Sequence, residues 1–369
     1  MNTKRLDYLD MVKGIGIFFV VLGHIEYISN PLRVWISSFH MPLFFVVSGL
    51  LLAIKDEPER DFSTCLNKKF KAIIIPYLWF SLMYFFIDIA NVTFLNNIDM
   101  HTFIVDTISS VTFYGMSVLW FLPAIFIANI AFLWLKKHAP DKFIIPFLII
   151  FALISYMIQR LCLNPLYEAY QDSLLITSLI NFIRVFLRAA IGLSFVGYAY
   201  YFHKLAARLI PDFVNSDKVL NKLILFITGA IMLIINIYLS TVNGAVDMHY
   251  IILNNVALYY LGAFLGCYGI IFICKSIPSV KIITYYGRNS LIVMACHVNF
   301  FILYASLRIA FKIDQYTTFA KHYIFLAVTM VCTFLLSAIV IEAIHRFFPF
   351  VLGKPFINPF SNNQNREGI

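Results

Sequence analysis

Charge is scarce in this 369-residue chain, in which Asp, Glu, Lys and Arg make up 13% of the residues and hydrophobic residues make up 61%. A soluble domain carries about 25% charged residues and could not bury so much apolar surface. The composition therefore excludes an ordinary soluble protein. It predicts a helical integral membrane protein, the all-α polytopic class.

Cysteine is also scarce, and its spacing indicates no site. The six cysteines form no CxxC pair and lack the density of a secreted disulfide scaffold. We therefore expect no disulfide and no metal site. The sequence has no visible soluble domain, low-complexity tract or repeat, which favours one membrane domain over 1–369, with spans at about 11–345 and a short polar tail at 352–369.

Long apolar runs are abundant. A helix needs about 20 apolar residues to cross some 30 Å of hydrocarbon, and about ten runs approach that length. An even number of spans would place both termini on one side of the membrane. The predicted spans lie near 11–28, 39–54, 70–90, 118–135, 143–158, 181–202, 221–241, 251–274, 289–311 and 322–343.

Basic residues fall mainly in alternate connections between these runs. Lys and Arg gather within 55–71, 136–142, 204–222 and 275–281, whereas the opposite connections carry few. Cytoplasmic loops are enriched in Lys and Arg, so we expect cytoplasmic termini and a multi-pass protein of a bacterial inner or plasma membrane. The net charge of +9 is then explained by the bilayer, and no nucleic-acid partner is expected.

His24 is the most informative residue, because it is an ionisable ring inside the first apolar run. Such a group costs free energy in lipid and usually marks function, although a histidine bonded to another helix for structural reasons is the alternative. A neutral imidazole can take a proton from a hydroxyl and pass it on. We predict that His24 is a general base.

Two neighbours of His24 are candidate substrate-binding residues. Glu26 is two positions further on, and in a continuous helix its side chain would point about 200° away, so it would not orient the imidazole. His40 precedes a Met-Pro pair that suits a helix start, so it is either an interfacial residue or a second group in the same cavity.

Four further polar or aromatic residues are expected in the outer half of the bundle. Arg184 and Arg188 are four residues apart and would stack on one helix face, where they either snorkel to headgroups or bind an anion in a cavity. Trp120 opens a span on that side, and His297 lies nearer the middle of another. All four are predicted to bind substrate.

Basic residues on the cytoplasmic side are candidates for binding a nucleotide donor. Lys68, Lys69 and Lys71 have a sufficient explanation as a topology signal, but ammonium groups also bind phosphate as point charges. Arg288 lies in a Gly-Arg-Asn-Ser segment that could cap a helix and expose amide groups to an anion. Neither pattern is a recognised phosphate-binding loop.

Four stretches resemble acyltransferase family 3, the integral membrane O-acyltransferases, and especially its fucose 4-O-acetylase-like branch. They are RLDYLDMVKGIGIFFVVLGH at 5–24, FHMPLFFVVSGLL at 39–51, KKFKAIIIPYLWF at 68–80 and GRNSLIVMACH at 287–297, with further support from WFLPAIF at 120–126. The first is the most specific, because a basic residue, Lys13, stands eleven positions before His24.

The resemblance implies that His24 is essential, that Lys13 occupies the family's basic position near the donor, and that acetyl coenzyme A is the donor substrate, with no permanently bound cofactor. The implied acceptor is a sugar hydroxyl of a cell-surface or lipid-linked glycan. One departure is Ala72, where many relatives carry a second Arg after the basic cluster. This departure weakens the assignment of donor phosphates to Lys69 and Lys71.

A transporter or flippase for a glycan or a small organic acid is the rival class, since polar groups inside a helical bundle also describe a permeation path. The sequence shows no pair of broken helices in two matching halves, which such transporters often have. Transfer of a radiolabelled acetyl group to a glycan would separate the two classes.

Overall fold

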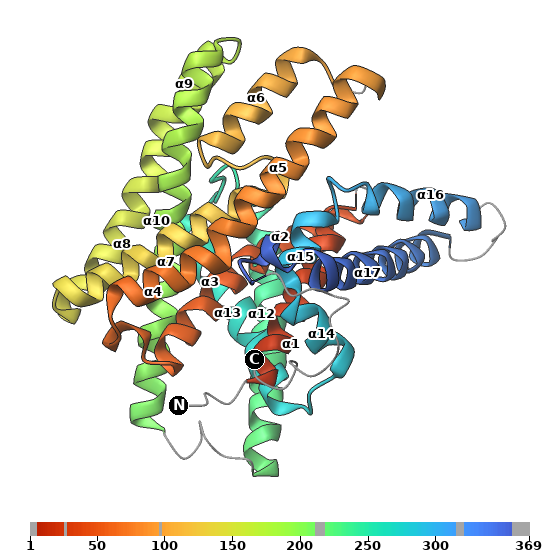
Figure 1. The fold of residues 1–369 in the computed structure, drawn as a ribbon. Coiled ribbons are helices and arrows are strands. Elements are labelled where there is room, and N and C mark those ends of the chain that lie inside the picture. The colour runs from red at the N-terminus through yellow and green to blue at the C-terminus, as the bar shows by residue number, and fades with distance from the viewer. Residues whose placement is uncertain (1–5, 26–27, 96–97, 211–217, 315–320, 356–369) are drawn as a thin grey trace.

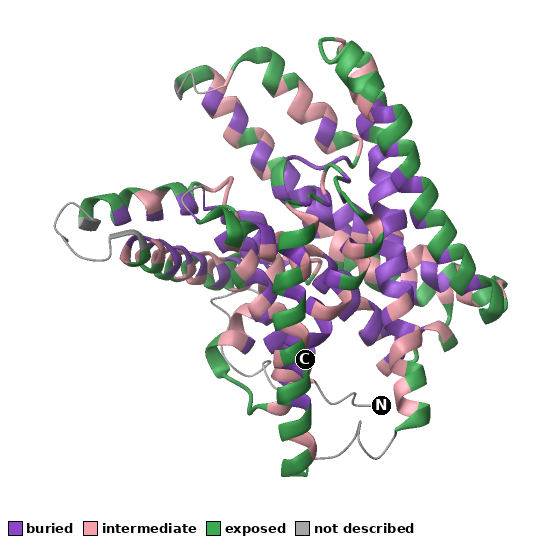
Figure 2. Cartoon of the chain, turned by 180° about the vertical axis from the view of Figure 1, so that it is seen from behind, coloured by how far each residue is buried: buried purple, intermediate pink, exposed green. Residues whose placement is uncertain are grey.

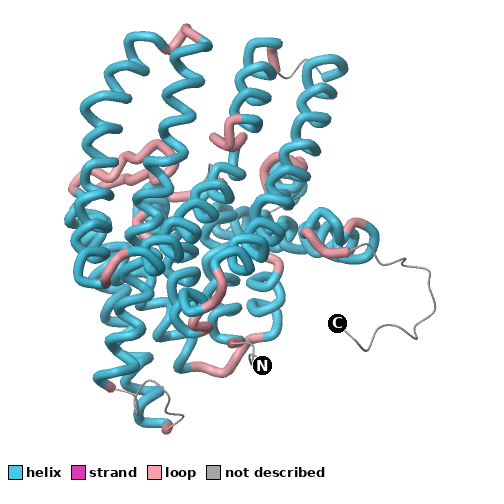
Figure 3. The backbone as a smooth tube through the Cα atoms, turned by 60° about the vertical axis from the view of Figure 1, so that its left-hand side comes forward, coloured by secondary structure: helices cyan, strands magenta, loops and turns pink. Residues whose placement is uncertain are grey.

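The computed structural model describes residues 6–25, 28–95, 98–210, 218–314 and 321–355. Within these ranges the regular elements are helices joined by loops, and the one β-type pairing is an isolated antiparallel bridge between Asp247 and Ile252 (Figure 3). The predicted all-α class is confirmed. Because a bilayer offers no water to satisfy backbone groups, helices that pair their own N–H and C=O groups are the expected solution.

The longer helices, together with the short segments that matter for the site, have the following bounds: α1 (Asp7–Gly23), α2 (Asn30–Ser37), α3 (His40–Ile54), α4 (Phe62–Lys69), α5 (Ile75–Ala90), α6 (Met100–Val111), the 3₁₀ segment η4 (Ser117–Trp120), α7 (Phe121–His138), α8 (Asp141–Ile158), α9 (Asn164–Tyr170), α10 (Leu174–Leu209), α12 (Val219–Asn243), α13 (Val256–Ser276), α14 (Lys281–Arg288), α15 (Ser290–Cys296), α16 (Ile302–Asp314) and α17 (Lys321–Phe347).

The core of the bundle lies around α1, α3, α10 and α13. Helix α10 packs on α3, α7 and α8, while α13 packs on α12, α3 and α1. Figure 2 shows buried residues concentrated along these central helices and exposed residues along the outer ones. Outward-facing side chains of α8 and α12, such as Phe147 and Ile234, are apolar. An apolar outer surface is what contact with lipid requires.

Within the described residues, eight helical segments are long and apolar enough to cross a bilayer. This agrees with a polytopic membrane protein, but it is fewer than the ten spans expected. Helix α1 has 17 residues and ends at Gly23, so the predicted span over 11–28 is too long at its carboxyl end.

The predicted span over 289–311 is broken. Helix α15 ends at Cys296 and α16 begins at Ile302, and between them Phe301 takes a positive φ of 57°. The segment 297–301 has no Pro or Gly to signal the break. Hydropathy alone therefore predicts one continuous span where the structure has two helices. Helices α16 and α17 pack together and project from one side of the bundle (Figure 1).

One end of the molecule, called the basic end below, carries the start of α1, the end of α10 and the start of α12, which lie low in Figure 1. It also carries the helix α4 and the start of α8, which lie higher, at the left of that view. The Lys-rich connections fall there. Helix α9 and the connection to α10 lie at the opposite end (Figure 1).

Candidate active site

A polar cavity of about 430 Å³ lies where the end of α1 meets α2, α3, η4 and the connection between α12 and α13. A larger cavity, about 950 Å³, lies between α8, α10 and α13, but its lining is mostly apolar and offers less chemistry. The polar cavity is lined by Gly23, His24, Arg33, Ile36, Ser37, His40, Met41, Ser117, Val118, Trp120, Val246, Asp247, Met248, His249 and Tyr250.

His24 follows the last residue of α1, and its ring is held by that helix. Its Nδ1 lies 2.7 Å from the carbonyl oxygen of Val20. A carbonyl can only accept a hydrogen bond, so Nδ1 carries the hydrogen and the neutral ring keeps its lone pair on Nε2. His40 is held in the same way by Ile36, at 2.8 Å. Both rings belong to the cavity wall and are set up to accept a proton.

His297 packs against His24 without lining the cavity. Its ring is fully buried, and its centroid lies 4.9 Å from that of His24 in an edge-to-face arrangement of 78°. Its Nδ1 donates to the carbonyls of Val293 and Met294, at 3.0 and 2.8 Å. The break after α15 therefore places a second imidazole beside His24, where it restricts the orientation of the His24 ring.

The connection between α12 and α13 is a small hairpin, residues 244–255, that supplies one third of the cavity lining. Asp247 and Ile252 exchange two backbone hydrogen bonds of 2.8 Å, and the Asn254 side chain donates to the carbonyls of Asn243 and Ala245. The span predicted over 251–274 therefore begins too early, because α13 starts at Val256. The Asn-Gly and Asn-Asn pairs that flank the hairpin are turn signals that could have identified it.

Trp120 and His249 form a stacked pair in the cavity wall. Their ring centroids lie 5.2 Å apart at 18°. Arg188, which is 1% exposed, lies behind them: its Nε donates to the His249 carbonyl at 2.6 Å, and its guanidinium lies 4.1 Å from the centre of the Tyr114 ring. Arg188, on α10, thus ties the hairpin to Tyr114 in the segment before η4. Arg188 is not among the residues that line the cavity, and its predicted contact with substrate stays a prediction.

Arg184 is also buried, at 4% exposure. Its Nη1 donates to Asn181 at 3.2 Å, the Gln159 amide lies beside it, and its guanidinium stacks over the Tyr167 ring at 5.1 Å. The snorkelling alternative is wrong for both arginines, because neither reaches the surface. The printed contacts of the two guanidinium groups are with carbonyl, amide and aromatic groups, and the Asp247 carboxylate is close enough to act on Arg188 through its charge.

Two residues predicted to bind the donor meet at the basic end. The buried Asp10 carboxylate pairs with Lys13 at 2.6 Å and with Arg288 at 3.2 Å, and Arg288 also pairs with Asp7 at 2.9 Å. These ion pairs form because α1 packs closely on α14. The contact has room only for glycine at position 287, since a Cβ there would lie 1.7 Å from the Asp10 carbonyl oxygen. Residues from opposite ends of the sequence therefore form one charged cluster.

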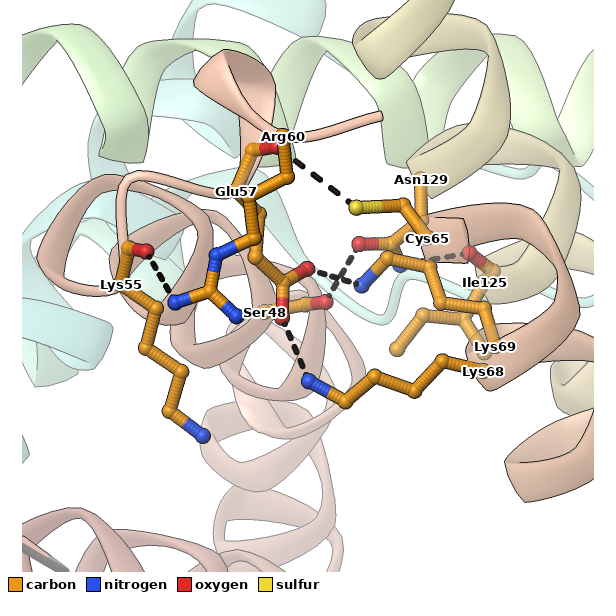
Figure 4. Close-up of polar contacts among 9 residues, drawn as sticks. All are labelled: Ser48, Lys55, Glu57, Arg60, Cys65, Lys68, Lys69, Ile125 and Asn129. Atoms are coloured by element: carbon orange, nitrogen blue, oxygen red, sulfur yellow. Dashed lines mark hydrogen bonds and ion pairs between the residues drawn. The ribbon is translucent and has the colours of Figure 1, made fainter. Parts of the chain in front are cut away.

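Lys68 and Lys69 converge on a different carboxylate, that of Glu57, each at 3.0 Å (Figure 4). Burial raises the pKa of Glu57, but the charges and hydrogen bonds of Lys69 and Lys68 outweigh burial, so the net pKa lies below its ordinary value. Lys71 is exposed and lies two residues beyond α4. Of the three lysines predicted to act together, two thus pair with the buried Glu57 carboxylate and Lys71 lies apart on the surface.

Glu26 lies outside the described residues, so its predicted contact with substrate stays a prediction. The argument that it must point away from His24 required a continuous helix, and α1 ends at Gly23. The cavity contains two chemically important residues that sequence reasoning missed, Asp247 and His249.

The family model described as an acyltransferase domain matches residues 6–340 of the chain. No curated protein and no solved structure matches the chain. The match does not distinguish branches of the family, so the likeness to fucose 4-O-acetylases stays a prediction. Because the match covers most of the chain, and because the helices and the polar cavity fit a membrane enzyme, the protein belongs to acyltransferase family 3 and is a membrane acyltransferase.

Proposed function

We propose that the protein is an O-acetyltransferase that moves an acetyl group from acetyl coenzyme A to a sugar hydroxyl of a cell-surface or lipid-linked glycan, with His24 as general base. The observation that carries the proposal is the state of His24 in the polar cavity. Its Nδ1 hydrogen is occupied by the Val20 carbonyl, which leaves the Nε2 lone pair to accept the proton of a hydroxyl.

In the proposed chemical step, His24 alone carries the proton. His24 Nε2 takes the proton of the sugar hydroxyl as its oxygen bonds to the carbonyl carbon of the thioester. The carbon–sulfur bond then breaks, and the departing thiolate receives the proton back from the imidazolium. Placing both reactants in one cavity converts a bimolecular reaction into a step within one complex.

The donor is assigned to the basic end. Lys13 and Arg288 meet there, and the eleven residues from Lys13 to His24 correspond to about 16 Å along a helix. A trough of about 530 Å³ follows α1 from Gly14 to Phe19, between α14 and α17. In this proposal, phosphate groups of the donor lie near Lys13 and Arg288, and its long thioester arm runs along α1 toward His24.

The rival transporter class has no observation that favours it. Family membership supports an acyltransferase. The arginines expected to line a polar path are buried in contacts with neutral groups.

Replacement of His24 by Ala tests the proposal. Purified protein in lipid vesicles would be incubated with radiolabelled acetyl coenzyme A and candidate glycans, and acetyl transfer would be measured. We expect His24→Ala to lower the rate about 10²- to 10⁴-fold, the usual contribution of a general base.

His138→Ala is the matched control, because His138 Nδ1 makes the same type of bond to the carbonyl four residues earlier, at 2.8 Å, but its ring is exposed at the end of α7. It should keep the wild-type rate. Normal transfer by a correctly inserted His24→Ala protein would remove the assignment of His24.

A further inference from the structure

The hairpin 244–255 brings a carboxylate to the wall of the cavity that holds His24. Asp247 and His24 both line this cavity, although they are far apart in the sequence. Among the cavity-lining residues that the structure describes, Asp247 is the one acid. Helix α1 itself offers no acid near His24 in the described part of the chain, because Asp7 and Asp10 lie at its other end.

The orientation of the Asp247 carboxylate is fixed by its own hairpin. Its Oδ1 accepts hydrogen bonds from the backbone N–H groups of His249 and Tyr250, at 2.7 and 3.3 Å. The backbone of Asp247 is fixed by its paired bonds to Ile252, and that of His249 by its bond from Arg188. A carboxylate has two oxygens with about four acceptor sites, and these two bonds use only Oδ1.

Among the described residues around His24, the other ionisable groups are basic, apart from the Tyr250 phenol in the cavity lining. Arg33 reaches the cavity from α2, His40 from α3 and His249 from the hairpin, while His297 packs against the ring from behind. A proton taken up by His24 would therefore add positive charge to a basic wall. A nearby carboxylate lowers the free energy of the imidazolium, and this effect is larger where water is restricted.

We propose that Asp247 is the counter-charge of His24, a positioning residue that stabilises the imidazolium formed when His24 takes the hydroxyl proton. This inference rests on the proposed function, because it assigns Asp247 a part in the same reaction. The competing explanation is that Asp247 only shapes the hairpin through its bonds to His249 and Tyr250.

Two substitutions separate these roles. Asp247→Asn keeps a side-chain oxygen that accepts both backbone N–H bonds but removes the charge, whereas Asp247→Ala removes both. Asp172→Asn is the control, because Asp172 is exposed in the connection between α9 and α10, away from the cavity.

The first measurement follows the protonation of His24 directly. Neutral imidazole reacts with diethyl pyrocarbonate, so the extent of modification of His24 against pH, read by peptide mass spectrometry, gives a midpoint. We expect Asp247→Asn to lower this midpoint by about half a unit to one unit, and Arg33→Gln to raise it, since loss of a negative or positive neighbour acts in opposite directions. An unchanged midpoint in Asp247→Asn would overturn the proposal.

The second measurement is acetyl transfer against pH. Asp247→Asn should lower kcat about tenfold or more, with the acid limb of the profile moved to lower pH and the KM for acetyl coenzyme A unchanged. A rate and profile equal to those of the wild type, or a loss of rate with no shift of the profile, would contradict the pairing. If the modification midpoint shifts but the wild-type protein transfers no acetyl group, the proposed function fails and the pairing of Asp247 with His24 stands.

Discussion

At the residue scale, the same local bond serves histidines with different roles. His24, His40 and His138 each place Nδ1 against the carbonyl of the residue four positions earlier. Their surroundings differ, because His24 and His40 line the polar cavity, whereas His138 is exposed at the end of α7. The tautomer is set by the helix, and the surroundings of Nε2 decide whether the ring can act on a substrate.

Arg188 gives a second prediction at this scale. Arg188→Lys keeps the charge but replaces the planar group that bonds the His249 and Tyr114 carbonyls and stacks on Tyr114. We expect the free energy of unfolding to fall by about 2 kcal/mol, within the range for hydrogen bonds of charged groups. Thermal unfolding in detergent would measure this, and the rate of acetyl transfer should fall with it.

The matched control is Arg308→Lys, since Arg308 also lies over a tyrosine ring, that of Tyr304, but is exposed on α16. It should leave the unfolding temperature almost unchanged. If the two substitutions lowered the unfolding temperature equally, the buried contacts of Arg188 behind the hairpin would contribute nothing extra to stability.

At the element scale, interruptions in the helices build the site. Helix α1 ends at Gly23, directly before His24, and the break after α15 places His297 against that ring. The hairpin between α12 and α13 adds Asp247 and His249. The residues around the cavity come from the ends of helices and from the segments between them. The cavity therefore lies where the spans stop or break.

The cluster around Glu57 holds α4 against the end of α3 and gives a pH-dependent prediction. The net pKa of Glu57 is lowered in the folded protein, so its ion pairs stabilise the fold above the ordinary pKa of a glutamate, about 4.3. This stabilisation is lost as the pH falls through the lowered pKa. The unfolding temperature of the wild type should therefore exceed that of Glu57→Gln near pH 7, and the difference should disappear under strongly acidic conditions.

Glu59→Gln serves as the control, because Glu59 is exposed two residues away and does not bind Lys68 or Lys69 in the described structure. Its unfolding temperature should follow that of the wild type at every pH. A difference between wild type and Glu57→Gln that persists unchanged into acid would contradict the ion-pair explanation.

At the scale of the whole molecule, the charge bias predicts which end faces the cytoplasm. The exposed Lys71 follows α4, a helix of the basic end, and the exposed Asp172 follows α9 along the chain. Helix α9 lies at the opposite end of the molecule (Figure 1). We expect a Lys71→Cys variant to react with a membrane-impermeant maleimide only after cells are opened, and an Asp172→Cys variant to react in intact cells. The background would replace Cys162 and Cys332, the native cysteines that are not buried. The reverse labelling pattern would invert the topology.

The sequence by itself determined the class of the protein, its family and most of its spans, because hydropathy, charge bias and short motifs are local properties. Tertiary structure decided the rest. Which groups surround Arg188, and which acid shares a cavity with His24, depend on contacts between segments that are distant in the sequence. The apolar run also continues through the break at 297–301, which contains no Pro or Gly. The sequence therefore gives no sign of the break, and only the packed structure shows that His297 contacts His24.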